Sequence, residues 1–410
     1  MNPNEIIKRY GSDPMEMTIS LLKYAGLAAL IGDTNKRIGI KPNLVTPTPA
    51  SYGATTHPEI VEGIVSYLQE HGFKNIIITE GSWVGDRTSE AYEYCGYRSV
   101  CEKYDVPFID TQKEKAHAVD LAGMELNICD VVDRIDFLIN VPVLKGHCQT
   151  RMTCALKNMK GLIPNSEKRR FHTMGLHKPI AYLSLGIRQD FIVVDHICGD
   201  PSFEEGGNPV KTDCVMVAAD PVLIDSYACK ILGRRIDEVP YIGMAEALGS
   251  GSSDLSCCTI SVINEHGEVL KQFAGNDPDP YAYDLKSENA LDVSVAVDEV
   301  DSCSACFAAF VGAVNRLRDE GVWDERKNGI VPGQDSPNTP NGHMTTTRRQ
   351  TGKIAIGQGH RGKTGTFGIG NCCREFDTYV PGCPPREEDI YEAISPFDFY
   401  HQVVYNSDVR

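Results

Sequence analysis

The sequence predicts an α/β protein whose larger domain is a doubly wound, mostly parallel sheet and whose smaller, C-terminal domain is also α/β. Apolar runs rich in Ile and Val alternate with helical segments through residues 1–235. Strands that are buried on both faces of a parallel sheet have that composition. The chain, at 410 residues, is also too long for one ordinary core. We therefore expect two domains, residues 1–292 and 293–410.

Start and stop signals divide the first domain into elements. The expected strands cover residues 37–41, 75–79, 137–143, 191–195 and 214–218. The expected helices cover residues 56–71, 89–104 and 221–232. The first of these helices begins at a capping box, Thr56 to Glu59, with a proline in its first turn. Residues 235–295 are less regular and are expected to pack on the sheet or to bridge the two domains.

The C-terminal domain is expected to be a small α/β unit whose loops carry cysteines. Its predicted helices cover residues 303–317 and 386–394, and its predicted strands cover residues 353–356 and 379–380. Residues 324–352 are rich in Pro, Gly, Asn and Thr and lack apolar periodicity, which predicts a long exposed loop. A second loop is expected over residues 357–373.

Composition and charge narrow the class of protein. Hydrophobic content of 41% and charged content of 23% are typical of a soluble globular protein. A net charge of −16 argues against binding nucleic acid through its phosphates. The longest apolar stretch, residues 17–31, is interrupted by Lys23 and has helical periodicity, so no membrane segment is expected. The N-terminus lacks the apolar core of a signal peptide, so we expect a cytoplasmic protein with reduced thiols.

Four of the 15 cysteines form a pattern near the C-terminus. Cys303 and Cys306 form a C-x-x-C pair, and Cys372 and Cys383 follow in Gly-Asn-Cys-Cys and Gly-Cys-Pro-Pro contexts. Two cysteines in one tight turn plus later single cysteines are a common ligand set for an iron–sulfur cluster. The pattern predicts a [4Fe–4S] cluster in a C-terminal iron–sulfur domain, with a zinc site and the absence of any metal as the alternatives. Cys373 is an alternative to Cys372 as the third ligand.

Polar side chains follow several predicted strands of the first domain. Ligands of open α/β sheets bind outside the carboxyl ends of the strands, so side chains at these ends are candidates for binding and catalysis. The candidates are Lys41, Asn43, Ser82, Lys145, His147, Asp195 and Asp220. Asp220 directly precedes Pro221 and equally fits the N-cap of a helix.

A basic block lies within this acidic protein. Residues 145–178 contain eight lysine and arginine side chains and three histidines, against the single acid Glu167. Such a block predicts a local positive field that attracts a small carboxylate or phosphate. Lys157 and Lys160 are three residues apart, so on a helix they would share one face and could converge on one anion. The alternatives are a solvated basic loop and a divalent metal held by the histidines.

Several motifs, in this order, resemble the domain of unknown function 362 family. They are Lys41-Pro-Asn-Leu44, Lys145-Gly-His147, Ala155-Leu-Lys-Asn-Met-Lys-Gly161, and the segment from Asp195 through Gly206-Gly-Asn-Pro209 to Ala219-Asp-Pro-Val222 with Asp225. The resemblance covers about residues 35–235. It implies an α/β fold and an association with iron–sulfur cofactors.

The stretch from Tyr379 to Arg386, with its Gly-Cys-Pro-Pro motif, resembles the cluster-binding small subunits of respiratory complex I and nickel–iron hydrogenases. That resemblance implies that Cys383 is a ligand of a [4Fe–4S] cluster beside a flavodoxin-like sheet. The pair Cys303 and Cys306 departs from the first cysteine pair of those subunits.

These features together favour an anaerobic oxidoreductase that acts on a small anionic substrate. A [4Fe–4S] cluster with four thiolates has no open iron, so its ordinary role is electron transfer, here from a donor such as ferredoxin. Lys145, His147 or Asp195 would supply protons. The expected substrate-binding residues are Lys41, Asn43, Ser82, Lys157, Lys160 and Asp220. The alternatives are a hydro-lyase or isomerase that uses iron as a Lewis acid, and a non-enzymatic electron-transfer or maturation partner; a homodimer is compatible with each.

Overall fold

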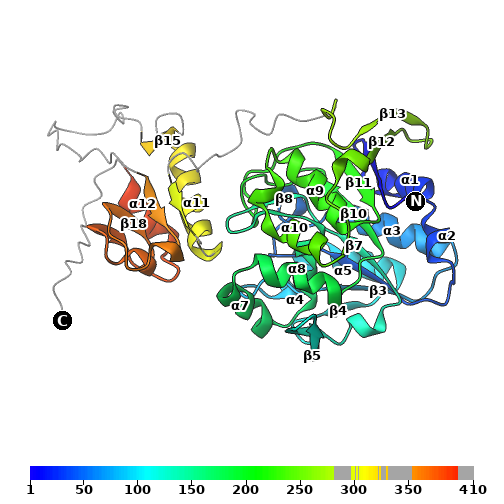
Figure 1. The fold of residues 1–410 in the computed structure, drawn as a ribbon, viewed down its shortest axis with the longest axis horizontal. Helices are drawn as coiled ribbons and strands as arrows, with labels where there is room; N and C mark the ends of the chain where they lie inside the picture. The colour runs from blue at the N-terminus through cyan, green and yellow to red at the C-terminus, as the bar shows by residue number, and fades with distance from the viewer. Residues whose placement is uncertain are drawn as a thin grey trace. The chain divides into compact units, whose positions relative to one another are not determined.

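The chain divides into two compact units, Met1–Ala290 and Leu291–Arg410 (Figure 1). The structure is a computed structural model, and it describes residues 1–280, 297–300, 302, 304–321, 323–324, 329–330 and 353–395.

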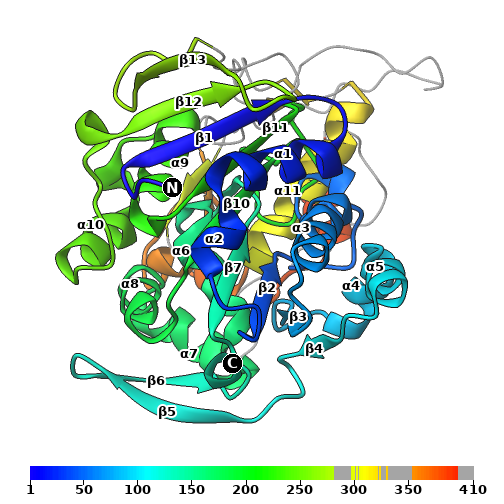
Figure 2. The ribbon, with the colours of Figure 1, turned by 90° about the vertical axis from the view of Figure 1, so that its right-hand side faces the viewer.

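The first unit is built on one nine-stranded sheet (Figure 2). Its strands, in spatial order, are β13 (Val269–Ala274), β12 (Thr259–Ile263), β1 (Glu5–Tyr10), β11 (Cys214–Ala218), β10 (Phe191–His196), β7 (Phe137–Val141), β2 (Ile38–Pro42), β3 (Ile76–Glu80) and β4 (Phe108–Asp110). The five strands from β10 to β4 are parallel, and β11 is antiparallel to both of its neighbours. The prediction of an α/β protein with a large, mostly parallel sheet is therefore confirmed.

Helices pack against both faces of this sheet because its strands are apolar on both sides. In β10, Ile192 and Val194 enter one core cluster, and Phe191 and Val193 enter the other. The Phe191 side is covered by α1 (Pro14–Ala25), α2 (Leu27–Ile31), α3 (Pro58–Glu70), α4 (Thr88–Tyr94) and α5 (Tyr97–Tyr104). The Ile192 side is covered by α6 (Ala155–Asn158), α7 (Asn165–Met174), α8 (His177–Gly186), α9 (Pro221–Ile231) and α10 (Pro240–Ala247). Among the described helices, none has the length and apolarity needed to cross a membrane.

One helix start and two helix lengths differ from the sequence prediction. Thr56 does not cap α3, since its hydroxyl bonds the Val141 carbonyl oxygen and the N-cap is His57, without a side-chain cap. The helix expected over residues 89–104 is two helices, because Gly96 adopts φ 82° between α4 and α5. The apolar stretch 17–31 is likewise divided at Gly26, between α1 and α2.

Sequence patterning missed the strands on one side of the sheet. Residues 5–10 form β1, which lies between β11 and β12, and residues 235–295 contribute α10, β12 and β13. Two antiparallel ladders outside the sheet were also missed. They are β5 (Ala116–Leu121) with β6 (Met124–Cys129), and β8 (Lys145–His147) with β9 (Arg151–Thr153).

The second unit contains a four-stranded parallel sheet. Its strands, in spatial order, are β14 (Val297–Glu299), β17 (Ile354–Ile356), β18 (Phe367–Ile369) and β19 (Thr378–Val380). β18 lies inside the segment that was predicted to be only a loop. The helices α11 (Ser304–Asp319) and α12 (Glu387–Ile394) pack together. The predicted loop 324–352 lies mostly outside the described residues, apart from Asp324 at the end of β15 (Trp323–Asp324) and β16 (Gly329–Ile330).

Candidate functional site

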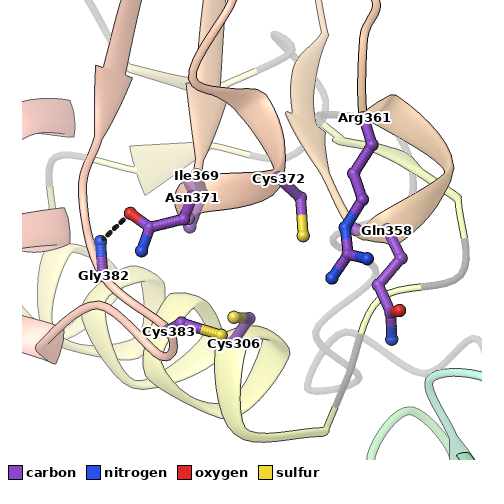
Figure 3. A pocket seen from close by; sticks show the side chains of 10 residues that line it. Cys306, Gln358, Arg361, Ile369, Asn371, Cys372, Gly382 and Cys383 are labelled. Atoms are coloured by element: carbon purple, nitrogen blue, oxygen red, sulfur yellow. Dashed lines mark hydrogen bonds between the residues drawn. The ribbon is translucent and has the colours of Figure 1, made fainter.

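Three of the four predicted ligand cysteines line one small cavity in the second unit (Figure 3). Cys306 lies in the first turn of α11, Cys372 follows β18, and Cys383 follows β19. The rest of the lining consists of Gly357, Gln358, Arg361, Ile369, Gly370, Asn371 and Gly382. The fourth predicted ligand, Cys303, lies outside the described residues. The cavity is thus placed at the carboxyl ends of parallel strands, where α/β folds usually bind ligands.

Glycines and one asparagine hold the two cysteine loops together. Gly370 adopts φ 85°, and a Cβ atom there would lie only 3.5 Å from Cys306 Sγ. The Asn371 N–H donates to the Gly382 carbonyl oxygen at 2.9 Å, and the Gly382 N–H donates to Asn371 Oδ1 at 2.8 Å. The loops therefore approach each other closely with no side chain at position 370 to fill the space near the cysteine sulfurs.

The geometry distinguishes the two adjacent cysteines. Cys372 is partly exposed and lines the cavity. Cys373 is buried, and its thiol contacts the Ala355 carbonyl oxygen at 3.5 Å. Burial raises the pKa of Cys373 to about 11, which disfavours the thiolate that a metal ligand must supply. Of the pair, Cys372 is the one placed to act as a ligand.

In the first unit, Lys145 is a buried residue whose ammonium group joins three segments. Its Nζ atom donates to Asn43 Oδ1 at 3.0 Å, to the Ala54 carbonyl oxygen, and to the Glu204 carbonyl oxygen at 2.7 Å. Three acceptors match the three N–H donors of an ammonium group. Burial and then the charge of Lys157 lower the pKa of Lys145 to about 7. Lys145 therefore anchors loops rather than presenting a free amine.

Lys41 is equally enclosed. It forms a buried ion pair with Glu80 and donates to the Pro42 carbonyl oxygen at 2.7 Å and to Asn158 Oδ1 at 3.2 Å. Asn158 in turn donates to the Lys41 carbonyl oxygen at 3.2 Å, and it accepts a hydrogen bond from Asn43 at 2.9 Å. Asn158 thus ties down the backbone at the end of β2, and Lys41 and Asn43 belong to the same buried polar network.

His147, Cys148 and Glu204 form a buried group of potential metal ligands, whose ligand atoms all lie within 4.8 Å of one another. Cys148 Sγ lies 3.1 Å from Glu204 Oε1, and the Cys148 N–H donates to Glu204 Oε2 at 3.0 Å. Cys148 and Glu204 were missed by sequence reasoning, although Cys148 directly follows a predicted site residue.

The hydrogen bonds of His147 oppose a role as a cation ligand. Its Nδ1 atom accepts from the backbone N–H groups of Gln149 at 3.0 Å and Thr150 at 3.2 Å. The neutral ring therefore carries its hydrogen on Nε2, which faces Glu204 Oε1 at 3.5 Å. Burial, followed by the charge of Lys157, moves the pKa of His147 well below its ordinary value. The ring is therefore neutral, with Nε2–H as a hydrogen-bond donor, and both this hydrogen and the neighbouring lysine charges oppose a cation.

Lys157 and Lys160 are the partly exposed members of the basic block. Lys157 Nζ contacts Thr153 Oγ1 at 3.1 Å. Burial lowers the pKa of Lys157 to about 8, and burial followed by the charge of Lys157 lowers that of Lys160 well below its ordinary value. Burial and then these two lysines also lower the pKa of His172 to about 3. The structure thus brings Lys145, His147, Lys157 and Lys160 into one electrostatic neighbourhood, as the basic block predicts.

Three other predicted site residues have structural hydrogen bonds. The Ser82 hydroxyl donates to the Leu44 carbonyl oxygen at 2.6 Å. Asp220 caps α9 through the N–H groups of Val222 and Leu223, so the helix-cap alternative describes its contacts. Asp195 binds the backbone N–H and the ring Nδ1 of His57, each at 2.8 Å.

Residues 38–230 match the family described as Domain of unknown function (DUF362). The match confirms the resemblance that the motifs between Lys41 and Asp225 indicate, and it ends before the cysteine cavity of the second unit. The thylakoid-associated protein sll1697 of Synechocystis sp. is 23% identical over 220 residues, which are 52% of this chain and 68% of the relative.

Two solved structures are similar to part of this chain, each at 13% sequence identity. The lactate racemase apoprotein from Thermoanaerobacterium thermosaccharolyticum has a TM-score of 0.35, with 47% of this chain and 50% of that chain covered. A Thermotoga maritima protein has a TM-score of 0.36, with 54% of this chain and 60% of that chain covered. The match therefore spans between half and 60% of the length of these proteins.

Replacement of Lys41 by Met should destabilise the first unit, because Glu80 would remain as an unpaired buried charge. We expect the free energy of unfolding to fall by about 3–5 kcal/mol, measured by urea denaturation. The matched control is Arg37→Met, which removes the exposed ion pair with Asp136 and should change stability little. Equal effects of the two substitutions would contradict a structural role for the Lys41 network.

Proposed function

We propose that the second unit binds a [4Fe–4S] cluster through Cys303, Cys306, Cys372 and Cys383, and that the protein is an oxidoreductase acting on a small anion. The observation that carries the proposal is the convergence of Cys306, Cys372 and Cys383 on one cavity (Figure 3). They come from one helix and two strand ends, as ligands that arrive from distant loops do. Such a cluster, when bound, supplies single-electron transfer.

The residues around the cavity fit this cofactor. Gly370 leaves space beside Cys306 Sγ, and the backbone bonds between Asn371 and Gly382 hold Cys372 and Cys383 at the same opening. Arg361 also lines the cavity and would offset the negative charge of a thiolate-bound cluster.

The lysine group of the first unit would bind the substrate. Lys157 and Lys160 are partly exposed. Burial disfavours their charged forms, and a bound carboxylate or phosphate would offset that effect. His147 Nε2–H would donate a hydrogen bond to the anion, because its Nδ1 accepts from backbone N–H groups and the ring hydrogen is therefore on Nε2. Lys145 and Lys41 would hold the loops in place. An electron donor such as ferredoxin completes the proposal.

A hydro-lyase or isomerase is the second candidate. It is favoured if Cys303 is not a ligand, since three described cysteines would then leave one iron open to act as a Lewis acid. Spectra of the anaerobically purified protein with and without candidate carboxylates separate the two, because a substrate that binds open iron perturbs the signal of the cluster. A cluster spectrum that does not change when a carboxylate is added, together with reduction of the cluster by ferredoxin, supports the oxidoreductase.

Replacement of Cys372 or Cys383 by Ala should remove most of the iron and destabilise the second unit, because ligand binding is coupled to folding. Cys373→Ala is the matched control and should retain iron, since its thiol faces Ala355. Iron and acid-labile sulfide are measured on anaerobic protein. Stoichiometric zinc without iron would refute the cluster, and loss of iron in Cys373→Ala alone would reverse the ligand assignment.

Anion affinity should fall as the pH rises from 7 to 9. Lys157 binds an anion when protonated, so affinity is full below its pKa of about 8 and is lost as the pH rises through that value. Sulfate is a suitable probe because its charge is constant in this range, and calorimetry in two buffers should detect proton uptake on binding.

Lys157→Gln should weaken sulfate binding by about 1–3 kcal/mol, the range for losing a charged hydrogen bond, and should remove the pH dependence. Lys178→Gln is the control, because Lys178 belongs to the same basic block but is exposed. Equal affinity of wild type and Lys157→Gln would show that the block is only a solvated surface.

A further inference from the structure

A second constellation of reactive side chains lies at the carboxyl end of β10, apart from the lysine group. Asp195 Oδ2 accepts from His57 Nδ1 at 2.8 Å, and His57 Nε2 lies 3.7 Å from Cys198 Sγ. The carboxylate therefore contacts one nitrogen of the imidazole ring, and the thiol lies near the other. This is the order in which a carboxylate orients a histidine that in turn activates a nucleophile.

The fold holds the three residues rigidly. Asp195 is buried at the end of β10, and its two oxygens also accept from the backbone N–H groups of His57 and Ile197. His57 is the N-cap residue of α3, so the start of a helix fixes its position. Gly53, with φ 82°, allows the neighbouring loop to pack so closely that a Cβ atom would lie 2.7 Å from the Cys198 carbonyl oxygen.

Exposure separates Cys198 from most other cysteines of the first unit. Cys214, Cys229 and Cys154, for example, are buried, whereas Cys198 is partly exposed. The His57 side chain is also 16% exposed, while the Asp195 side chain is only 1% exposed. A small reagent can therefore approach the thiol from solvent, while the carboxylate that orients the ring remains buried.

Electrostatics favour a charged histidine in this group. Burial alone lowers the pKa of His57, but the charge and hydrogen bond of Asp195, with a smaller contribution from Cys198, outweigh burial and raise it to about 11. The titratable groups that face the ring are Asp195 and Cys198. Tyr97, whose hydroxyl donates to the Thr56 carbonyl oxygen, also interacts with the charge of Asp195. An imidazolium beside a thiol stabilises the thiolate, which is the nucleophilic form of cysteine.

We propose that Cys198, His57 and Asp195 form a thiol-modification site, in which Cys198 is a nucleophilic thiolate that exchanges with small-molecule disulfides. The Cys198 thiolate attacks one sulfur of the disulfide, a new S–S bond forms at Cys198, and the original S–S bond breaks. The leaving thiolate takes a proton from solvent. Cys198 is thereby oxidised, the released half of the disulfide is reduced to a thiol, and the number of S–S bonds is unchanged. His57 stays protonated and paired with Asp195 throughout. The Ala50 carbonyl oxygen, 3.4 Å from Cys198 Sγ, is the competing acceptor that would hold the neutral thiol.

Alkylation of the full-length protein with iodoacetamide at pH 6, followed by peptide mapping, tests the proposal. An ordinary thiol with a pKa of about 8.5 is only about 0.3% ionised at this pH. Cys198 should therefore react more than about 10-fold faster than Cys257, an exposed thiol in the same protein whose neighbour is the Asp254 carboxylate. His57→Gln should reduce the Cys198 rate to that of Cys257. With oxidised glutathione at pH 6, Cys198 should form the mixed disulfide before Cys257 does.

A second measurement does not depend on the folding of the histidine variant. The thiolate absorbance of wild type minus that of Cys198→Ala should show one thiolate already present at pH 6. A Cys198 rate equal to or below that of Cys257 at pH 6, or a difference absorbance that appears only above pH 8, would overturn the proposal. The same reactivity in a folded His57→Gln variant would also overturn it, since the imidazole would then contribute nothing.

Discussion

Ammonium groups buried beneath loops of the first unit determine how those loops are arranged. A buried charge costs free energy unless its hydrogen-bond donors are satisfied. Each of these lysines therefore requires neighbouring loops to turn carbonyl oxygens inward. The carbonyl acceptors are Pro42 for Lys41, Ala54 and Glu204 for Lys145, and Gly81 and Ser82 for Lys168. The positions of the remaining polar side chains at this edge follow from that requirement.

This constraint divides the four lysines of the basic block that are not exposed into two kinds. Lys145 and Lys168 donate to protein oxygens and stabilise the loops, whereas Lys157 and Lys160 are partly exposed and lie in a neighbourhood of other positive charges. The second kind carries a burial cost that a bound anion offsets. His147 adds a hydrogen-bond donor, Nε2–H, because backbone N–H groups determine its tautomer. Lysines that support the loops and lysines available for the proposed anion thus lie within one short segment.

The second unit repeats the same placement with different side chains. Its parallel strands also end in loops that converge, but there the loops carry cysteines and glycines instead of lysines. Gly370 supplies a positive-φ turn beside Cys306, and Asn371 joins the two loops. Thiols are thereby collected at one opening, while Cys373, one residue away, points into the core. Both units use the carboxyl ends of parallel strands as the place where reactive side chains gather.

The sequence by itself determined the α/β class, the main parallel strands and the cysteine loops, because apolar periodicity and glycine contexts are local properties. It also identified Lys145, His147, Lys157 and Lys160 through their density along the chain. It missed β1 and β12, which are short strands recognisable only by the neighbours they pair with. The tertiary structure alone decided which lysines have all their hydrogen-bond donors paired with protein oxygens. It also decided that Cys372 rather than Cys373 lines the cavity, and that His57 contacts Asp195 and Cys198. These outcomes depend on contacts between residues far apart in the chain, and no local pattern encodes which distant donor finds which acceptor.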